Sequence, residues 1–313
     1  MFRKLPIIAA IVCIGVGPSL AWNRAGHMVT GAIAFDQLLK TSPSTLARVV
    51  AILRQHPQYE SRWKPQLAGM SEQDQEQLLF MLAARWPDDI RGDKAFDHPV
   101  WHYIDYPYKP KGQPDSVPAP APPSDNMVAA FQQNVAIIQS AAPDSQTDAQ
   151  KAVALCWIFH LMGDSHQPLH AVSLFTTQFP KGDQGGNLFF ISYPKPADPS
   201  SPVTQNLHAY WDGILLADDR YDPARTLAGR IENEREPTSL KAPAESLFEK
   251  WTHQSFDLAV SRVYRKGKLK ISTDKNAGTP LPHDYHAIAE RVAQRQVALA
   301  GYRLADFLRT NFP

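Results

Sequence analysis

The feature that most constrains this chain is an apolar segment, residues 157–170, that carries histidine and aspartate side chains and is interrupted by a proline. His160 and Asp164 are four residues apart, so on a helix they lie on one face, about one turn from each other. Pro168 lacks a backbone N–H and disfavours helical geometry in the preceding residue, so the helix is expected to end there. His170 lies beyond the break and can turn back toward the same point.

A histidine and an aspartate at this spacing are also common as a surface pair or as a pair satisfied within a core. The surrounding residues make the predicted helix apolar on most sides: Leu155, Ile158, Phe159, Leu161 and Met162. Ionisable side chains on a buried helix need a charged or hydrogen-bonding partner, or a metal ion. This segment therefore favours a metal site with two imidazoles and one carboxylate.

The N-terminal residues 1–21 have the pattern of a secretory signal peptide. Two basic residues precede an apolar run, and a small-x-small sequence ending at Ala21 offers a cleavage site. Cleavage there would make Trp22 the new N-terminus and leave Cys156 as the only cysteine, so no internal disulfide is expected. No later stretch is long and apolar enough to span a bilayer, and the sequence predicts a secreted or periplasmic protein.

Residues 22–313 are long enough for one large domain with a sizeable core, and no linker divides them. Loss of the leader would change the formal net charge from +1 to −1, because it removes two basic residues. Without a basic bias, tight binding along an extended duplex by counterion release is not expected. A nucleic-acid substrate would have to be held locally, over a few nucleotides.

Helical periodicity dominates residues 22–313 and predicts a mainly α fold, a single multi-helix domain with a short β-hairpin. Helices are expected over residues 26–40, 44–55, 72–85, 125–141, 148–167, 206–216, 246–263 and 286–311. Residues 106–123 contain seven prolines and are expected to form a non-helical surface loop. Residues 188–191 follow a Gly-Gly-Asn sequence and supply the expected β-hairpin.

Other stretches share the chemical character of the central segment. His208 and Asp212 repeat the four-residue spacing on a second predicted helix, and His27, Asp88 and His102 lie near other helix ends or in an aromatic run. Each residue alone has an ordinary structural explanation, such as a core histidine or a helix-end aspartate. Together they would require several independent coincidences, and a shared metal centre explains all of them.

These stretches resemble the S1/P1 family of secreted, zinc-dependent nucleases, whose fold and metal site are similar to those of zinc-dependent bacterial phospholipase C. The resemblance spans residues 22–313 and rests on six motifs in order: Trp22 with His27, Trp86-Pro87-Asp88-x-x-Arg91, His102-Tyr103-Ile104-Asp105, His160-x-x-x-Asp164-x-His166-Gln167-Pro168-x-His170, Gly185-Gly186-Asn187, and Asn206-Leu207-His208-x-x-x-Asp212.

The resemblance implies three zinc ions per chain, each with the nitrogen and oxygen ligands that zinc accepts. The first ion would be bound by Asp88, His102, His160 and Asp164. The second ion would be bound by His170, His208 and Asp212. The third would be bound by His27, Asp164 and the amino and carbonyl groups of Trp22. Asp164 can serve two ions because a carboxylate has two oxygens, and the Trp22 amine is available only after cleavage behind Ala21.

The resemblance further implies hydrolysis of the 3′-oxygen–phosphorus bond in RNA and single-stranded DNA, giving 5′-phosphates, often with 3′-nucleotidase activity. Zinc ions suit attack on phosphorus because they acidify bound water and stabilise a leaving oxygen. Asp164 and Arg91 are the expected catalytic residues, Arg91 by contacting a phosphate oxygen. Asp105 is expected near the reacting phosphate, in a catalytic and substrate-binding role, and Asn187 is expected to make a polar substrate contact.

Two further positions of the family pattern are less direct. His166 lies between the ligand positions, and its expected role is to support the site or the fold. The family's lysine beyond Asp105 has no clean match, because Lys109 and Lys111 straddle its place in the proline-rich loop. A contact from that lysine is therefore not carried over to this chain.

Two alternatives remain open. A phospholipase C would use the same ions on a phospholipid, but Asp212 stands where that branch has a glutamate, and no loop exposes an aromatic run for membrane docking. A non-catalytic zinc-binding protein would need closed ligand sets, whereas Arg91 is expected beside open metal positions. The sequence thus favours single-stranded nucleic acid or nucleotides as substrate, with aromatic stacking supplying affinity, and a monomeric protein.

Overall fold

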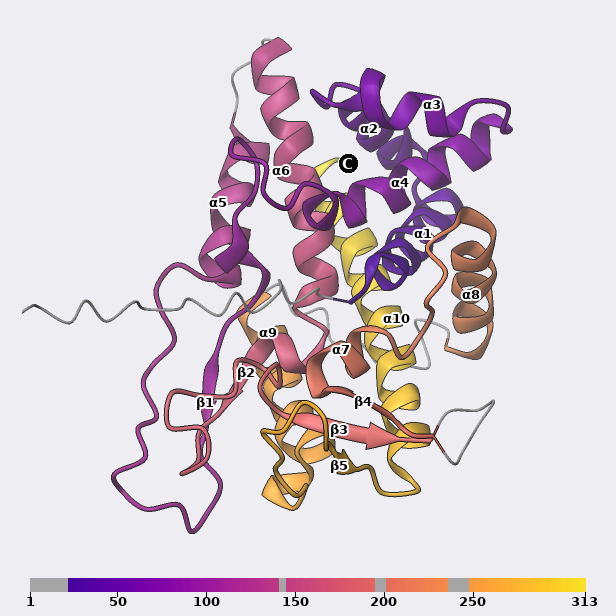
Figure 1. The fold of residues 1–313 in the computed structure, drawn as a ribbon. Coiled ribbons are helices and arrows are strands. Elements are labelled where there is room, and N and C mark those ends of the chain that lie inside the picture. Colours follow the sequence, from indigo (N-terminus) through magenta and orange to yellow (C-terminus); the bar gives the residue numbers. More distant parts are fainter. Residues whose placement is uncertain (1–21, 141–144, 195–200, 236–247) are drawn as a thin grey trace, which may run out of the picture.

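The computed structural model describes residues 22–140, 145–194, 201–235 and 248–313, so the expected leader, residues 1–21, lies outside the described residues. Helices dominate, as Figure 1 shows, and the predicted mainly α fold is confirmed. The α-helices are α1 (Arg24–Thr41), α2 (Pro43–Leu53), α3 (Lys64–Leu67), α4 (Glu72–Asp89), α5 (Met127–Gln139), α6 (Ser145–Asp164), α7 (Leu207–Asp212), α8 (Tyr221–Glu234), α9 (Phe248–Leu258) and α10 (Tyr285–Asn311). Within the ranges described, none of these helices is long and apolar enough to cross a membrane.

Asparagine side chains cap α1, which carries His27, and α7, which carries His208 and Asp212. The Asn23 side chain accepts a hydrogen bond from the backbone N–H of Gly26 at 3.0 Å and thereby caps α1. The Asn206 side chain accepts from the N–H of Ala209 at 2.7 Å and caps α7. Such caps satisfy N–H groups that have no partner within the helix and stabilise it by about 1 kcal/mol.

Several predicted helix ends were wrong by a few residues, and one difference affects the site. Helix α4 was expected to stop at Arg85, but it continues through Pro87 to Asp89, which places Asp88 in its last turn. Proline removes one hydrogen bond but does not end a helix whose two ends are packed against other elements. Helix α8 was not predicted, and the expected helix 246–263 continues from α9 into a π-helical turn (Ala259–Val263).

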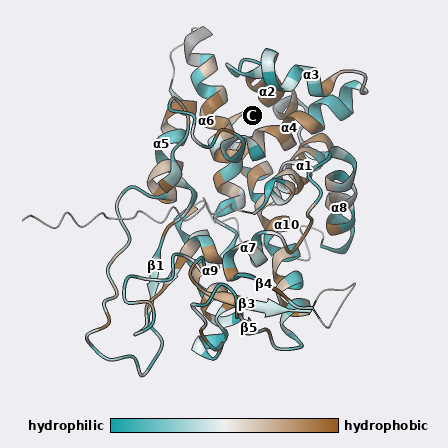
Figure 2. Ribbon diagram, viewed as in Figure 1, coloured by the Kyte–Doolittle hydropathy of each residue, from teal (hydrophilic) through white to brown (hydrophobic). Residues whose placement is uncertain are grey.

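Short strands form two small sheets in the lower half of the view in Figure 1. Strands β3 (Phe190–Tyr193) and β4 (Val203–Asn206) pair antiparallel as the expected hairpin, and β5 (Thr279–Pro280) adds to β3 in parallel. The proline-rich segment was expected to be a loop throughout, but it begins with strand β1 (Tyr106–Tyr108), which pairs in parallel with β2 (Val172–Leu174). The remainder of that loop is largely hydrophilic (Figure 2).

Helix α1 lies inside the helical part of the protein and packs against α4, α6, α8 and α10. Two glycines permit the close approaches. A Cβ on Gly31 would lie 2.6 Å from the Phe80 carbonyl oxygen of α4, and one on Gly301 of α10 would lie 2.6 Å from the Ile33 side chain. Interior helices packed this closely have little freedom to shift, so side chains that project from α1 and α6 are held at fixed positions.

Candidate metal centre

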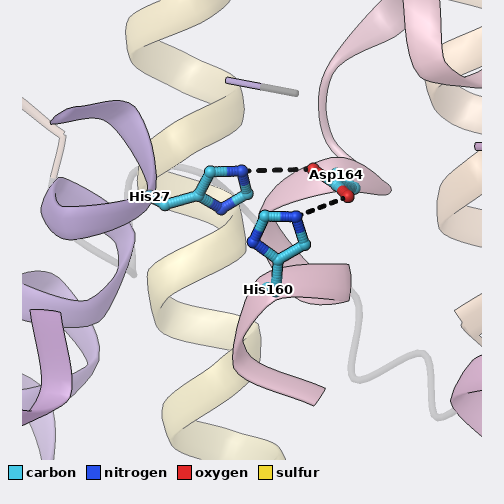
Figure 3. A group of neighbouring side chains, drawn as sticks. All are labelled: His27, His160 and Asp164. Atoms are coloured by element: carbon cyan, nitrogen blue, oxygen red, sulfur yellow. Dashed lines mark ion pairs between the residues drawn. The ribbon is translucent and has the colours of Figure 1, made fainter. Parts of the chain in front are cut away.

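The first cluster joins helices α1 and α6 and contains His27, His160 and Asp164, all completely buried. The two oxygens of Asp164 receive different histidines: His27 Nε2 lies 3.2 Å from Oδ1 and His160 Nε2 lies 3.1 Å from Oδ2 (Figure 3). The two imidazole rings stack at 3.9 Å between centroids. A Cβ on Gly163 would lie 2.6 Å from His27 Nδ1, so a glycine is required where the two helices meet.

A second cluster shares His160 and adds Asp88 from α4 and His102. His102 ends a 3-10 turn (Pro99–His102), and its Nδ1 lies 2.8 Å from His160 Nε2 and 3.3 Å from Asp164 Oδ2. Asp88 Oδ1 lies 3.9 Å from His160 Nε2 and 4.0 Å from His102 Nδ1. Asp164 therefore contacts both groups of ligand candidates, as a bridging carboxylate would.

The third cluster is made by His170, His208 and Asp212. His170 lies on the 3-10 turn that follows α6 (Pro168–Ala171), so the break at Pro168 turns the chain back as predicted. His208 and Asp212 lie one turn apart on α7. The Nε2 atoms of His170 and His208 are 3.1 Å apart, and the Asp212 oxygens lie 4.0 Å and 3.4 Å from them.

Backbone carbonyls determine which nitrogen of these rings faces the centre. His160 Nδ1 contacts the Ala84 carbonyl at 2.9 Å, His170 Nδ1 the His102 carbonyl at 2.7 Å, and His208 Nδ1 the Gly185 carbonyl at 2.7 Å. A carbonyl can only accept, so in each ring Nδ1 donates and Nε2 of the neutral imidazole carries a lone pair. The facing Nε2 atoms of His170 and His208 thus repel one another unless a cation lies between them. The residues fit a divalent metal.

Burial and neighbouring charges shift the ionisation of three histidines and of Asp164 in the directions that metal binding needs. Burial lowers the pKa of His27, His102 and His170, so these rings favour the neutral form. Burial opposes ionisation of Asp164, but the nearby histidines outweigh it and hold the Asp164 pKa well below its usual range. Neutral imidazoles and an ionised carboxylate are the forms that bind metals. In the absence of an ion, burial raises the pKa of Asp212 well above its usual range, and the Asp164 and Asp88 carboxylates outweigh burial and raise the pKa of His160.

Two supporting contacts at Asp212 were not predicted. The Gln167 amide donates to Asp212 Oδ1 at 2.6 Å, while its oxygen accepts from the Leu169 backbone N–H at 2.6 Å. The backbone N–H of Asn23 donates to the Asp212 carbonyl at 3.1 Å, which joins the start of α1 to the end of α7. A glutamine before a proline carries little signal by itself, and only the fold shows that it orients the carboxylate.

The predicted substrate-contacting residues, Arg91, Asp105 and Asn187, are not members of the three clusters. The Arg91 guanidinium donates to Asp88 Oδ1 at 2.8 Å and 3.2 Å, so it is paired with a ligand candidate. Burial and the charge of Asp183 raise the pKa of Asp105 to about 7. The Asn187 amide donates to the Gln184 carbonyl at 2.8 Å and braces the loop that contacts His208.

The remaining residues named from the sequence are Trp22, His166, Lys109 and Lys111. Trp22 is fully buried at the start of α1. His166 is turned into a separate buried network: its Nδ1 donates to the Met162 carbonyl at 2.7 Å, and Arg303 donates to its Nε2 at 2.8 Å. The Lys109 ammonium is bound within its own loop to the Val117 carbonyl at 2.9 Å, and Lys111 is exposed.

A mainly helical chain in which eight buried His and Asp residues converge in three adjoining clusters has the character of a polynuclear metalloprotein. The S1/P1 Nuclease family matches residues 22–313, and the chain belongs to this family of nucleases. It is 23% identical to Endonuclease 1 of Arabidopsis thaliana over 99% of this chain and 93% of that protein. Endonucleases 4 and 5 of the same plant are 25% and 26% identical over 51% of this chain, and the matched region spans about half the length of each.

Proposed function

We propose that this chain is a zinc-dependent endonuclease that hydrolyses single-stranded DNA and RNA to 5′-phosphate products and also has 3′-nucleotidase activity. The observation that carries the proposal is the 3.1 Å separation of the facing Nε2 atoms of His170 and His208, two rings that donate from Nδ1 to backbone carbonyls. A cation between them removes the repulsion. Membership of the S1/P1 nuclease family identifies the reaction as phosphodiester hydrolysis.

Three zinc ions are proposed, held by the ligand sets that the family resemblance implies. All side-chain donors are imidazole nitrogens and carboxylate oxygens, a set that zinc accepts. The bound ions would supply Lewis-acid chemistry, acidifying water and stabilising charge on the phosphate. One Asp164 oxygen lies 3.2 Å from His27, and the other lies 3.1 Å from His160 and 3.3 Å from His102, so this carboxylate could serve two neighbouring ions.

The remaining roles belong to side chains around the clusters. Arg91 holds Asp88 and directs its planar guanidinium toward a phosphate oxygen. Asp105 accepts a proton or orients water near the reacting phosphate, and Asn187 contacts substrate from the loop beside His208. Tyr103 follows the ligand candidate His102 and is 37% exposed, so its ring offers a surface on which a base of a single strand can stack.

The N-terminus is part of this proposal. We assign residues 1–21 as a signal peptide that directs export, and residues 22–313 as a single nuclease domain. Removal of the leader frees the amine of Trp22, which ligates the third ion with His27 and Asp164. The capped start of α1 supports this assignment because Asn23 is fixed to both α1 and Asp212.

The test compares mature protein loaded with zinc on four substrates: single-stranded DNA, RNA, a 3′-nucleotide and phosphatidylcholine vesicles. We expect hydrolysis of the first three, loss of activity with a chelator, and recovery when zinc is restored. A His208→Ala variant should be inactive, whereas Lys111→Ala, an exposed change outside the clusters, should retain activity. Hydrolysis of the lipid alone would identify a phospholipase, and zinc binding without any hydrolysis would identify a binding protein.

A further inference from the structure

Asp183 is a buried carboxylate beside the loop that contacts His208, and the proposed chemistry gives it no role except to raise the pKa of Asp105. Asp183 is fully buried, and both of its oxygens accept hydrogen bonds from protein donors. Oδ1 accepts from the Leu174 backbone N–H at 2.8 Å, and Oδ2 accepts from the Tyr264 hydroxyl at 2.7 Å. These donors direct its oxygens to Leu174 and Tyr264, and Asp183 is not among the ligand candidates of the three clusters. It connects its own loop to strand β2, nine residues earlier in the chain, and to Tyr264, 81 residues later.

One of these segments follows directly from the ligand candidate His170. Leu174 ends strand β2, which continues from the 3-10 turn that carries His170. The backbone N–H of Asp183 also donates to the Leu174 carbonyl at 3.0 Å, so Asp183 and Leu174 are joined by two hydrogen bonds. Tyr264, which is 1% exposed, comes after α9 and holds the other oxygen of the carboxylate.

The loop that Asp183 anchors has an unusual backbone. Gly182, Gln184, Gly185 and Gly186 all have positive φ, from 56° to 86°. A left-handed conformation costs a non-glycine residue roughly 1–2 kcal/mol, so at Gln184 the loop must be held from outside. Glycine at position 185 is also required by space, because a Cβ there would lie 2.4 Å from the Leu169 carbonyl oxygen and 3.2 Å from His208 Nδ1.

This loop presents the carbonyl that sets the tautomer of a ligand candidate. The Gly185 carbonyl accepts from His208 Nδ1 at 2.7 Å, which leaves the lone pair of Nε2 directed toward His170 and Asp212. We propose that Asp183 and Tyr264 are a positioning pair that holds this loop against β2 so that His208 presents Nε2 to the metal. The pair thereby sets the separation of His170 and His208. This inference rests on the proposed metal centre.

The test measures metal affinity in place of catalysis. Wild type, Asp183→Asn and Tyr264→Phe are stripped with a chelator and titrated with Zn²⁺ against a chromophoric competitor. Loss of a residue that orients a metal ligand typically weakens affinity by about 10–100-fold, so we expect about tenfold for Tyr264→Phe and more for Asp183→Asn. Only one of the three ions should be affected, because the other two clusters take their ligand candidates from α1, α4, α6 and the 3-10 turn that ends at His102.

Tyr302→Phe is the matched control. Tyr302 is a buried tyrosine of α10 whose hydroxyl donates to the Arg235 carbonyl at 2.8 Å, outside the three clusters. It should bind all ions as wild type does, even where its thermal unfolding temperature falls. Tyr264→Phe keeps the aromatic ring, so it tests the positioning role even when Asp183→Asn does not fold.

The outcomes separate this inference from the proposed function. Three ions bound by wild type with unchanged affinities in folded Tyr264→Phe and Asp183→Asn would overturn the positioning role and leave the nuclease proposal standing. An equal weakening at all three ions would also overturn it, since it would indicate a general structural effect. Failure of wild-type protein to bind zinc would overturn the metal centre and this inference together.

Discussion

The two halves of the centre are held in different ways. His27, His160 and Asp164 project from long interior helices, and their positions follow from the packing of α1 against α6. His170, His208 and Asp212 lie on a short turn and a six-residue helix, and hydrogen bonds from Gln167 and the Gly185 loop orient them. The first group, which we call the helical half, is therefore positioned by the close packing of helices. The second group, the loop half, is positioned by individual hydrogen bonds.

The largest effect is expected at Asp164, whose two oxygens contact His27, His102 and His160. Asp164→Asn leaves the packing nearly unchanged but replaces one carboxylate oxygen with an amide donor that faces a histidine. Two ions should be lost, and activity should fall by more than the roughly 10–100-fold typical of a supporting residue. Metal analysis after dialysis, together with nuclease assays, would check this. Retention of all ions would contradict the assignment of Asp164 as the shared ligand.

Adding one methyl group at Gly163 should disturb the packing of the helical half, although no polar atom is changed. Gly163→Ala places a Cβ against His27, and overpacking of this kind costs about 1–3 kcal/mol. We expect a lower free energy of unfolding and weaker binding of the ion that His27 ligates. Gly229→Ala on α8 is the control, because a Cβ there meets nothing within 4 Å. That substitution should stabilise the helix by roughly 0.5–1 kcal/mol.

The zinc affinity of the loop half should fall when one hydrogen-bonding group is removed with little change in side-chain volume. Gln167→Met removes the donor to Asp212 and should weaken one zinc site by about tenfold. It also removes the acceptor of the buried Leu169 N–H, so the free energy of unfolding of the metal-free protein should fall by about 1–3 kcal/mol. Gln66→Met, on an exposed position of α3, is the control. If Gln167→Met destabilised the fold but bound zinc normally, the contrast between the two halves would be lost.

The smallest expected effect is a shift in a pH profile. Burial and Asp183 raise the pKa of Asp105 to about 7, well above the usual carboxyl value, so Asp105 is protonated below that pH and ionised above it. If the carboxylate is the working form, kcat/KM falls as the pH falls through about 7, and Asp105→Asn removes this limb at a lower overall rate. Zinc content must be followed over the same range, because protonation of the ligands also releases metal.

Sequence reasoning located the ligand candidates because their signal is local. His160 and Asp164, and likewise His208 and Asp212, show a spacing that only a helix converts into a chelate, and Pro168 marks the turn to His170. The apolar periodicity of α1, α6 and α10 was equally readable. The family resemblance supplied the grouping of ligands, which no spacing in the chain could show.

The remaining features depend on tertiary contacts. Pro87 signals a helix end, yet α4 continues past it because packing outweighs one missing hydrogen bond. The pairing of β1 with β2 joins segments far apart in the chain, and strands of three residues carry no measurable periodicity. Gly163, Gln167 and Asp183 acquire their roles only from neighbours that the fold brings to them.

Cys156 is buried and unpaired, so the described chain has no covalent cross-link. The centre joins His27 near the start of α1 to Asp212 at the end of α7, with ligand candidates from α4, α6 and two turns between them. Ions bound there would close several long loops of chain at once, as a set of disulfides does, and their binding energy would add directly to folding stability. Such a cross-link is reversible, so a chelator should act on this protein as a reducing agent acts on a disulfide-stabilised one.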